Sequence, residues 1–569
     1  MNAGYFQNVS GVLTLASTDR LTTNVTIGSD GTFGGTGTVV GNTIVNGGGT
    51  LAPGVPNAPG LVSTPGTLTI QGNLQFNPGS TYSLQLAPGA TSLTNVTGTA
   101  AIASGSQAQA FLAPGIYTVG SRIPVLTTAP NGLTGTFGSF AFNSAGIIKV
   151  APRLSYDGQD VFLTLAQAPL PTVPAGTPSN GVNVAAALSG FINAGGALPT
   201  LLQNLYPLSL SPAAYAATLN QLGGQTPTAA ATDVALTMNS FLTTMFDFSA
   251  PGRQEVGTPI AFAPEAQVAP EVALAYAAVT PKGAMVTKAP AYVYEPRWST
   301  WASGFGGTSR IGGDATVGSQ DLRANIAGGA AGIDYRMSPD TTLGFALSGG
   351  ETHFSLDGAF GSGNTDFFQG GAYGKQRFGN AYVAAAAAFG AHHVTTDRTV
   401  AVGAGSDHST ATFTASSVAG RVEGGYRFGG PFNGVTPYAA VQAQSVFTPG
   451  YTETSTGGTA QTFASKDTTA TRTELGSWLD TRVNAVLFRG RAAWVHEFNR
   501  DASITAGFAA FASPNFVVTG AQRPGDAALV SGLFEVPVFT NVTFSGRADA
   551  ELASHATTWT GMGTVRWVW

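Results

Sequence analysis

The feature that most restricts the fold of this chain is the alternation of apolar and polar side chains along residues 297–569. In residues 542–552, for example, Val542, Phe544 and Leu552 alternate with Arg547, Asp549 and Glu551. Successive side chains of a β-strand point to opposite faces, so the pattern predicts strands with one apolar and one charged face. Such strands form either a sandwich that buries the apolar face or a barrel that turns it toward lipid.

Charged residues keep to one face in the segments 417–428, 472–483, 488–499 and 542–552. The residues expected on this face are Arg421, Glu423, Arg427, Glu474, Asp480, Arg482, Arg489, Arg491, Glu497, Arg547, Asp549 and Glu551. Aromatic residues lie near strand ends, as in the girdles of membrane barrels. The number of such strands and the single charged face favour a membrane barrel, with these charges lining a wet, charge-balanced lumen.

The chain has no apolar run of about 18 residues, so no transmembrane helix is predicted. Bilayers otherwise admit only closed barrels, because unpaired backbone groups are not tolerated in hydrocarbon. We expect twelve antiparallel strands, at 297–310, 322–337, 341–356, 364–378, 380–397, 408–429, 435–448, 470–484, 488–499, 527–538, 541–553 and 556–569. Short turns alternate with longer loops, notably 449–469 and 500–526, as in outer-membrane barrels.

The first part of the chain contains short alternating segments separated by Gly and Asn, such as residues 35–51 and 65–76. Gly and Asn provide corners with positive φ. Short strands joined by such corners suit a parallel β-helix, in which each rung buries its face against the next. A β-sandwich is the alternative. The rungs lack the Gly-Gly-x-Gly-x-Asp pattern that binds calcium.

Charge and cysteine content limit the chemistry that this chain can perform. Residues 1–200 carry only Arg20, Arg122, Lys149, Arg153, Asp19, Asp30, Asp157 and Asp160 as charged side chains, and no His. General acid–base catalysis needs such groups within hydrogen-bond reach, so we expect no active site there. The chain has no Cys, which excludes disulfides and thiolate metal sites. The net charge of −5 gives no indication of nucleic-acid binding.

The other candidates for chemistry are weak, and we expect no enzyme activity, cofactor or metal. His392 and His393, with Asp397 and His408, lie near one long-loop end, where such side chains could collect a transition metal. Adjacent residues of a strand point to opposite faces, so the two neighbouring histidines do not share a metal site without a bulge. No Gly-x-Ser-x-Gly motif of a lipase occurs in the chain.

Between these parts lies a region of low charge with helical signals. Residues 167–210 are rich in Pro, Ala and Gly and are predicted to be a linker. A helical segment spans 211–248, in which Ser211-Pro212 begins one helix and a second follows Thr226-Pro227. The second is apolar over much of its surface and needs an enclosing partner, so we assign it as the pore helix, with Val234, Met238, Phe241, Leu242 and Met245. Residues 249–296 form a further linker, with a rival helix at 271–279.

Several motifs resemble those of monomeric autotransporters, the type V secretion class of Gram-negative bacteria. They are Arg491-Ala-Ala-Trp-Val-His-Glu-Phe498, Ala528-Leu-Val-Ser-Gly-Leu-Phe-Glu535 and the terminal Val565-Arg-Trp-Val-Trp569. Asn220-Gln-Leu-Gly-Gly224 is similar to the stretch that precedes such barrels. Gly48-Gly-Thr-Leu-Ala-Pro-Gly54 followed by Pro65-Gly-Thr-Leu resembles the passenger-associated transport repeat. This similarity extends over nearly the whole chain.

The resemblance implies an all-β chain with a right-handed parallel β-helix segment, a linker helix and a C-terminal 12-stranded antiparallel transmembrane barrel. Its domains would be a β-helical passenger segment at 1–98, a cap at 99–166 that assists passenger folding, and the barrel at 297–569. It also implies a monomeric barrel in outer-membrane lipid, with the N-terminal region at the cell surface. Assembly would need the barrel-assembly machinery and periplasmic chaperones, with Val565, Trp567 and Trp569 as the C-terminal assembly signal. By the same resemblance, the barrel exports and displays its own passenger, which we expect to be adhesin-like and to bind a ligand on a host or another cell.

Alternatives remain at this stage. Residues 1–20 show no basic or apolar leader, so we expect that passenger sequence is missing upstream. The barrel would then be the secretion domain of an enzyme whose catalytic passenger lies there, or else a porin-like barrel. The lumen charges either pair and stiffen the wall, or guide an extended chain or seat the helix. No Asn-Asn pair occurs, so we predict no self-cleavage of the kind seen in some relatives.

Overall fold

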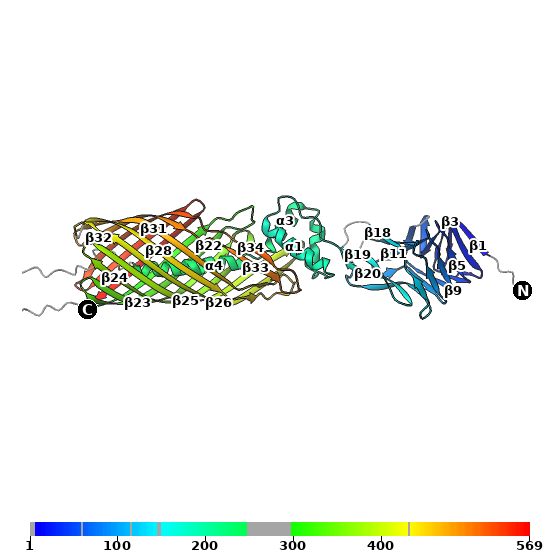
Figure 1. Ribbon diagram of the computed structural model, residues 1–569, viewed down its shortest axis with the longest axis horizontal. Coiled ribbons are helices and arrows are strands. Elements are labelled where there is room, and N and C mark those ends of the chain that lie inside the picture. The colour runs from blue at the N-terminus through cyan, green and yellow to red at the C-terminus, as the bar shows by residue number, and fades with distance from the viewer. Residues whose placement is uncertain (1–5, 59–60, 114–116, 145–148, 247–296, 431–432) are drawn as a thin grey trace, which may run out of the picture.

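The computed structural model describes residues 6–58, 61–113, 117–144, 149–246, 297–430 and 433–569. The molecule is elongated, with a stack of short strands at the N-terminal end, a group of helices in the middle and a long barrel at the other end (Figure 1). No helix of these residues is both long and apolar enough to cross a membrane.

The N-terminal region consists of twenty short strands that coil into rungs. They are β1 (Phe6–Leu15), β2 (Arg20–Leu21), β3 (Asn24–Gly35), β4 (Thr38–Val40), β5 (Thr43–Val45), β6 (Thr50–Pro53), β7 (Val55–Ala58), β8 (Leu61–Thr64), β9 (Thr67–Gln71), β10 (Leu74–Phe76), β11 (Thr81–Ala87), β12 (Ala90–Thr91), β13 (Leu93–Val96), β14 (Ala100–Ile102), β15 (Gln107–Leu112), β16 (Arg122–Thr127), β17 (Leu133–Gly135), β18 (Ser139–Ser144), β19 (Val150–Tyr156) and β20 (Asp160–Gln167).

Parallel pairing stacks these strands into three faces. The first face contains β2, β4, β9, β13 and β16, and the second contains β5, β10, β14 and β17 beside the first half of β3. The third contains β6, β11, β15 and β18 beside the second half of β3. The curled parallel sheets confirm a β-helix-like segment rather than a sandwich. At the far end of the first face, β20 pairs antiparallel with β16 and β19.

Asparagine and glycine shape the corners of the rungs. The backbone N–H of Asn42 donates to Asn24 Oδ1 at 2.7 Å, and that of Asn73 donates to Asn42 Oδ1 at 2.8 Å. This ladder pairs polar groups that the corner would otherwise leave unsatisfied. At Gly35, φ is +112° and a Cβ would lie 2.0 Å from the carbonyl oxygen of Leu15, so only glycine is accommodated there.

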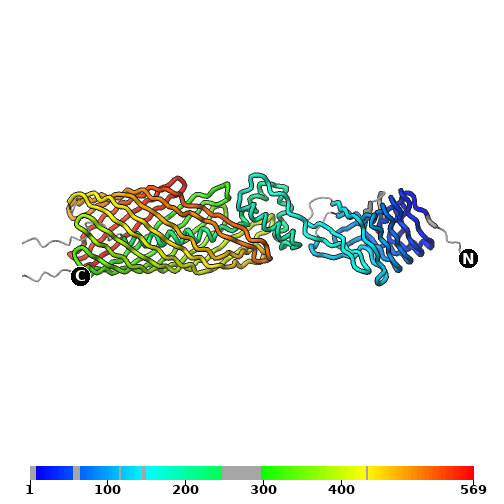
Figure 2. Tube along the Cα trace, viewed as in Figure 1, coloured from blue at the N-terminus to red at the C-terminus, as the bar shows by residue number. Residues whose placement is uncertain are grey.

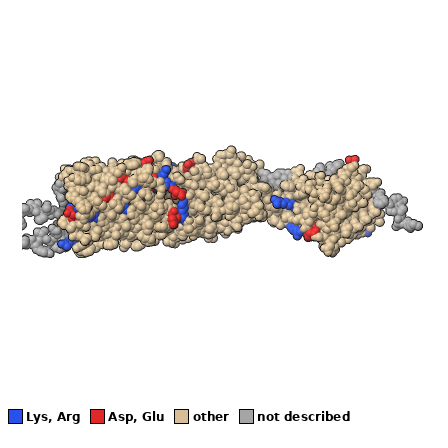
Figure 3. All heavy atoms as spheres, viewed as in Figure 1, with Lys and Arg blue, Asp and Glu red and all other residues tan. Residues whose placement is uncertain are grey.

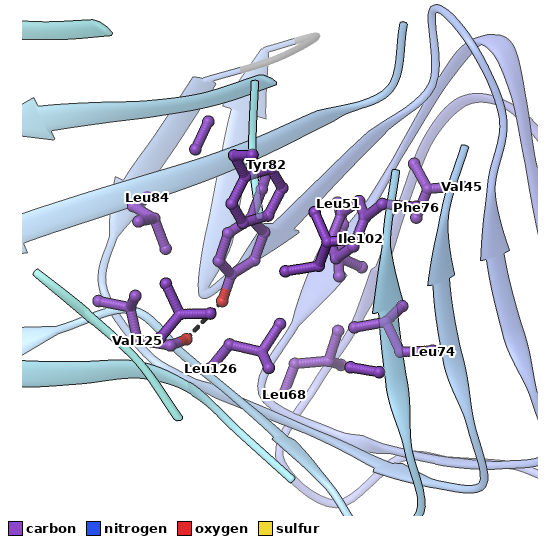
Figure 4. Close-up of a cluster of buried hydrophobic side chains, with 14 of the residues drawn as sticks. Val45, Leu51, Leu68, Leu74, Phe76, Tyr82, Leu84, Ile102, Val125 and Leu126 are labelled. Atoms are coloured by element: carbon purple, nitrogen blue, oxygen red, sulfur yellow. Dashed lines mark hydrogen bonds between the residues drawn. The ribbon is translucent and has the colours of Figure 1, made fainter. Parts of the chain in front are cut away.

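The rungs enclose one apolar core (Figure 4). Leu51, Leu68 and Phe76 point into it from different faces and are fully buried. Tyr82 is also buried, and its hydroxyl donates to the carbonyl oxygen of Val125 at 2.5 Å. Burial strongly raises the pKa of this phenol, so the hydroxyl keeps the proton that makes the bond.

Residues 297–569 form a barrel of twelve antiparallel strands, as the alternation predicts (Figure 2). The strands are β21 (Trp298–Ile311), β22 (Leu322–Ser338), β23 (Thr341–Leu356), β24 (Gly361–Phe378), β25 (Ala381–Val402), β26 (Gly405–Tyr426), β28 (Gly434–Thr448), β31 (Lys466–Val483), β32 (Val486–Glu497), β35 (Asp526–Phe539), β36 (Val542–Ala553) and β37 (Ala556–Val568), with the short β27 (Phe428–Gly429) beside β28. Pairing of β21 with β37 and of β26 with β28 closes the sheet, so the barrel strands have no open edge.

The two ends of the barrel differ. Trp298, Trp569 and the short turns at 339–340, 379–380, 484–485 and 540–541 lie at one end, here called the turn end. The longer connections lie at the other, the loop end, on the side of the helices and the β-helix (Figure 1). Uncharged residues cover most of the barrel wall visible in Figure 3, as a lipid-facing surface requires.

The loop end has more structure than the sequence indicates. The connections expected as loops at 449–469 and 500–526 contain β29 (Tyr451–Thr452), β30 (Gln461–Phe463), β33 (Ser503–Phe508) and β34 (Phe516–Thr519), which pair into a small sheet. The hairpin of β25 and β26 also extends past the expected ends of its strands. These strands form because apolar residues such as Phe463, Ile504 and Val518 find a partner surface in the helices.

Four helical elements precede the helix in the barrel: α1 (Ser179–Asn193), η1 (Leu202–Asn204), α2 (Leu205–Leu208) and α3 (Pro212–Gln221). The first three lie inside the range expected as a linker. The ends of that range are rich in Pro and therefore indicate a linker. Between them, the apolar residues from 182 to 192 recur with helical spacing. Burial of Val184, Leu188 and Ile192 against the loop sheet stabilises the helix. A further short helix, η3 (Asp357–Ala359), joins β23 to β24.

Candidate functional site: the barrel lumen and its external mouth

One helix, α4 (Thr226–Phe246), runs along the inside of the barrel (Figure 1). It packs against β22 to β26 and β28. Pro227 occupies the first turn, where its missing N–H costs nothing. The helix enters from the loop end and ends with Phe246, whose ring lies 5.2 Å from the guanidinium of Arg421.

The apolar stripe of α4 is sealed against the barrel wall. Val234, Met238, Phe241, Leu242 and Met245 are 0 % exposed. Their neighbours are small or aromatic residues of the inner wall, including Trp301, Phe354, Tyr373, Ala386 and Ala419. The structure therefore places all five residues assigned to the pore helix in one interface. The rival helix at 271–279 lies outside the described residues.

The inner wall of the barrel also carries a network of ion pairs. Arg421 donates to Glu474 at 2.8 Å and to Glu423 at 2.8 Å. Glu474 also faces Arg472 at 3.2 Å and Arg491 at 3.9 Å. Burial opposes these charges, but their mutual attraction and hydrogen bonds stabilise the charged forms. Further pairs complete the network: Arg472–Glu551 at 2.8 Å, Arg472–Glu497 at 3.6 Å, Arg491–Asp549 at 3.0 Å and Arg547–Asp549 at 2.9 Å.

A second cluster lies nearer the turn end. Asp480 forms an ion pair with Arg489 at 3.0 Å and also pairs with Arg427. Arg482 is partly buried in the same strand, β31. The twelve charged residues expected in the lumen are thus all buried or partly buried. Some pair across strands that are distant in sequence, as Arg491 of β32 does with Asp549 of β36. The alternation of apolar and polar residues in the sequence predicts on which face of each strand these charges lie. It does not predict which residues they pair with.

The last strand presents its aromatic residues outward. Val565, Trp567 and Trp569 are 49 %, 49 % and 41 % exposed. The backbone of Trp569 exchanges hydrogen bonds with that of Trp298, at 3.0 and 2.8 Å, so the two ends of the barrel chain meet here. Arg566 points inward and pairs with Asp334. The assembly signal expected from the sequence therefore lies on the lipid-facing side at the closure of the barrel.

The histidines remain apart. His392 is buried and lies 2.8 Å from Ser417 Oγ, whereas His393 is exposed on the other face. His408 pairs with Asp397 at 2.6 Å on the surface. In the part of the chain that the structure describes, no three metal-ligating side chains of His, Asp or Glu gather in one place.

The mouth of the barrel contains a feature with no strong sequence signal, a ring of side-chain amides that we call the amide collar: Asn180, Asn220, Gln221, Gln225 and Gln461. Asn220 and Gln225 both donate to the carbonyl of Gly318, at 2.8 and 2.6 Å. Gln221 donates to Thr399 at 3.1 Å, and Gln461 donates to Leu222 at 2.5 Å. Asn180 donates to the carbonyl of Thr519 at 2.8 Å and accepts from its N–H at 2.9 Å. The collar ties the chain that leaves the lumen to several separate loops.

Residues 179–222, here called the helical cap, rest on these loops. Val184, Leu188, Leu202 and Leu219 share a core with the apolar residues of the loop sheet. Toward the β-helix, Gln167 Nε2 donates to the hydroxyl of Tyr206 at 2.8 Å. Burial raises the pKa of Tyr215 to about 12, so its hydroxyl keeps the proton that it donates to Pro171 at 3.1 Å. The helical cap therefore joins the β-helix to the barrel mouth.

Geometry thus defines an outer-membrane β-barrel with a helix of its own chain in the lumen and a folded N-terminal region beyond its loop end. The family model of the autotransporter beta-domain matches residues 300–549. This region is therefore an autotransporter β-domain. The barrel is the outer-membrane translocator of a passenger, it lies in the outer membrane with the passenger at the cell surface, and the translocator itself is not catalytic.

Among curated proteins, the chain is 26 % identical over 230 residues to an extracellular serine protease of Serratia marcescens. The match covers 39 % of this chain and 22 % of that protein, so the chain spans about a fifth of the length of this relative.

Among solved structures, the translocator domain of the autotransporter NalP from Neisseria meningitidis is 12 % identical, with a TM-score of 0.40 over 48 % of this chain and 90 % of that chain. The β-domain of the Bordetella autotransporter BrkA is 17 % identical, with a TM-score of 0.36 over 48 % and 100 % of the two chains. The transport unit of AIDA-I from Escherichia coli is 13 % identical, with a TM-score of 0.32 over 52 % and 96 %.

Proposed function

We propose that the passenger of this translocator is the β-helical segment of residues 1–166 and that it acts on the cell surface as an adhesin-like binding module. The observation that carries the proposal is its place beyond the loop end of the barrel, on the far side of the helical cap (Figure 1). Its stacked parallel strands are rich in uncharged Thr and Asn side chains, interspersed with Gly. Such a surface suits many weak polar contacts with a ligand on a host or another cell.

A protease experiment on intact cells tests this topology. An epitope tag inserted at Gly89, an open turn of the β-helix, should be cleaved by added protease while the barrel band stays protected. A matched tag at Gly379, in a turn at the other end of the barrel, should be cleaved only after the outer membrane is permeabilised. The reverse result would place the β-helix in the periplasm and support a porin-like protein instead.

A catalytic passenger on the same translocator is the second candidate. It is favoured by the likeness to an extracellular serine protease. Residues 1–200 contain no His and only eight charged side chains, so in that case the catalytic groups would have to come from other sequence. Hydrolysis of a peptide substrate by intact cells that display the natural full-length protein would distinguish the two candidates.

Within the passenger, we propose that residues 99–166 act as a folding cap. The support is the antiparallel hairpin of β19 and β20, which adds to the first face at β16. Antiparallel strands can close from a local turn, whereas parallel rungs need distant contacts. Once folded, residues 99–166 would thus give the earlier rungs a template against which to stack.

We also propose that the outward residues Val565, Trp567 and Trp569 are recognised by the barrel-assembly machinery, with periplasmic chaperones protecting the strands before assembly. Their exposure and their place at the closing strand support this role. Replacement of both Trp567 and Trp569 by Ala should leave synthesis unchanged but strongly reduce the heat-modifiable barrel band in outer membranes.

The matched control for this prediction is Phe539→Ala, which removes a more exposed aromatic residue near the same end of the barrel. Both the tryptophan exchange and Phe539→Ala reduce contact with lipid. A larger loss of assembly in the tryptophan variant would therefore indicate that the terminal residues are recognised specifically. Equal assembly of the two variants would argue against the recognition of the last strand.

A further inference from the structure

The first face of the β-helix differs in charge between its two ends. Three of the four basic side chains of residues 1–200 lie between Arg122 and Arg153, at the end of this sheet that β16, β20 and β19 form. The strands β13, β9 and β4 further along the sheet carry no charged residue. Figure 3 shows basic side chains gathered at the end of the β-helix that is nearer to the barrel. The positive charge of this face is therefore concentrated at the barrel-side end.

Two arginines lie on either side of Thr164 on the outer side of the sheet. Arg122 of β16 and Arg153 of β19 both pair in register with Thr164 of β20. Leu163 and Leu165 are buried in the core, so Thr164 and its two partners project outward. Neighbouring strands lie about 4.8 Å apart, which puts the backbones of the two arginines about 10 Å apart. Both arginines are exposed, and we call the three residues the arginine row.

Arg122 is held in place by its neighbours. Its guanidinium lies 3.5 Å from the centroid of the Phe162 ring and 3.7 Å from the carboxylate of Asp157. Asp157 is fixed in turn, because it accepts from the backbone N–H groups of Gln159 and Asp160 at 2.9 and 2.7 Å. A guanidinium that is already fixed over a ring loses little side-chain freedom when it binds an anion.

Arg153 is left without a charged partner. In the part of the chain that the structure describes, its guanidinium forms no ion pair or side-chain hydrogen bond. Between the two arginines, the hydroxyl oxygens of Thr164 and Ser155 lie 3.1 Å apart. Two like charges on one face of a sheet repel each other, so an anion seated between them would be stabilised by both.

We propose that the arginine row binds an acidic saccharide and that its natural ligand is a phosphorylated sugar of the outer leaflet around the barrel. Guanidinium groups bind phosphate through two parallel N–H bonds, which Arg122 and Arg153 can supply from opposite sides. The hydroxyls of Ser155 and Thr164 both donate and accept, so they suit the hydroxyl groups of a sugar. Phosphate groups are carried on sugars in the outer leaflet of an outer membrane.

The place of the arginine row in the fold favours the cell's own surface as the source of the ligand. The strands β19 and β20 lie at the end of the β-helix next to the helical cap, whereas β1 lies at the opposite end (Figure 1). A ligand on another cell would meet the end at β1 first, and sugars of the cell's own outer leaflet would meet the end at β20. Binding there would fix the base of the β-helix against the sugar layer of its own membrane.

Fluorescence anisotropy with a labelled saccharide tests the proposal. The probe is the phosphorylated core oligosaccharide released from lipopolysaccharide by mild acid, which carries no acyl chain that could bind the barrel wall. The full chain, purified in detergent, should bind this probe, and removal of its phosphate groups should abolish binding. Arg153→Gln should weaken binding about tenfold or more, because charge-assisted hydrogen bonds are lost.

The matched control is Arg20→Gln. Arg20 is an exposed arginine of β2 at the other end of the same sheet, where it donates to Gln71 at 2.9 Å. This variant should bind the probe as tightly as the unchanged chain. Because Arg20 and Arg153 are both exposed, neither exchange disturbs the core, and matching circular dichroism spectra of the two variants verify this. Equal binding by the two variants, or binding of the dephosphorylated probe, would overturn the proposal.

Heparin, a sulfated saccharide of animal tissue, is the second probe and distinguishes the sources of the ligand. If heparin bound at Arg153 and the core oligosaccharide did not, the ligand would belong to another cell, and the assignment to the cell's own leaflet would be wrong. The natural role rests on the proposed display of residues 1–166 at the cell surface. The binding measurement uses purified protein, so its failure is distinguishable from a failure of display, which the protease experiment detects.

Discussion

Exchange of Phe241 for Asp is expected to prevent α4 from seating in the barrel. Phe241 is fully buried against the inner wall with Met238, Leu242 and Met245. Loss of its ring alone should cost about 4 kcal/mol, and an unpaired carboxylate in that interface adds to the cost. The assembled band should then lose its resistance to heating in detergent at a clearly lower temperature than in the unchanged protein.

The neighbouring residue provides the control for this variant. Ser240→Asp introduces the same carboxylate one position earlier, where it would face the cavity lined by charged residues instead of the sealed stripe. We expect little change in heat resistance for this variant. If both variants behaved alike, the helix would not be held on the wall by the stripe that the structure shows.

Exchange of Glu474 for Gln is the second change with a large expected effect. Glu474 is buried and serves Arg421, Arg472 and Arg491 together, while the hydroxyl of Tyr438 donates to it at 3.2 Å. Gln keeps the shape but removes the charge, so three arginines lose one shared partner. Breaking a buried ion pair by removing one member costs about 3–5 kcal/mol.

Urea unfolding of the reconstituted barrel, followed by the loss of the heat-modifiable band, would measure this cost. Glu351→Gln is the matched control because Glu351 lies exposed on the outer wall. A drop in stability confined to Glu474→Gln would assign the lumen charges a role in stiffening the barrel. Equal stability of the two variants, together with slower export of the β-helix in Glu474→Gln, would instead favour a role in guiding the chain.

Much of the barrel could be predicted from the sequence because its pattern is local. A period of two, interrupted by turn residues, is visible without knowing which strands pair, and it gives the twelve strands and their inward charges. The single apolar helix with few charges indicates an enclosed position for the same reason. By contrast, the partner of Arg472 in β36 depends on how strands far apart in sequence meet across the lumen.

The loop end could not be predicted in the same way. The apolar residues of α1 and of β33 are too few in each segment to predict an element alone, and they are buried only because the two meet. Residues of the amide collar bind backbone carbonyls, which every residue of the loops provides. Uncharged amides that bind backbone carbonyls show no characteristic spacing or charge pattern in the sequence. The amide collar is therefore visible only in the three-dimensional structure.

The amide collar also decides how the molecule bears mechanical load. A pull on the displayed β-helix passes through residues 168–178 and reaches α1 before it reaches α4. There the backbone of Ser179 and Asn180 donates to the loop carbonyls of Thr316 and Val317, beside the paired bonds of Asn180 with Thr519. Bonds that are stretched together share the force, so none breaks alone. Drag from liquid flowing past the cell is therefore borne by the rim of the barrel, and the helix in the lumen stays free of tension until that rim gives way.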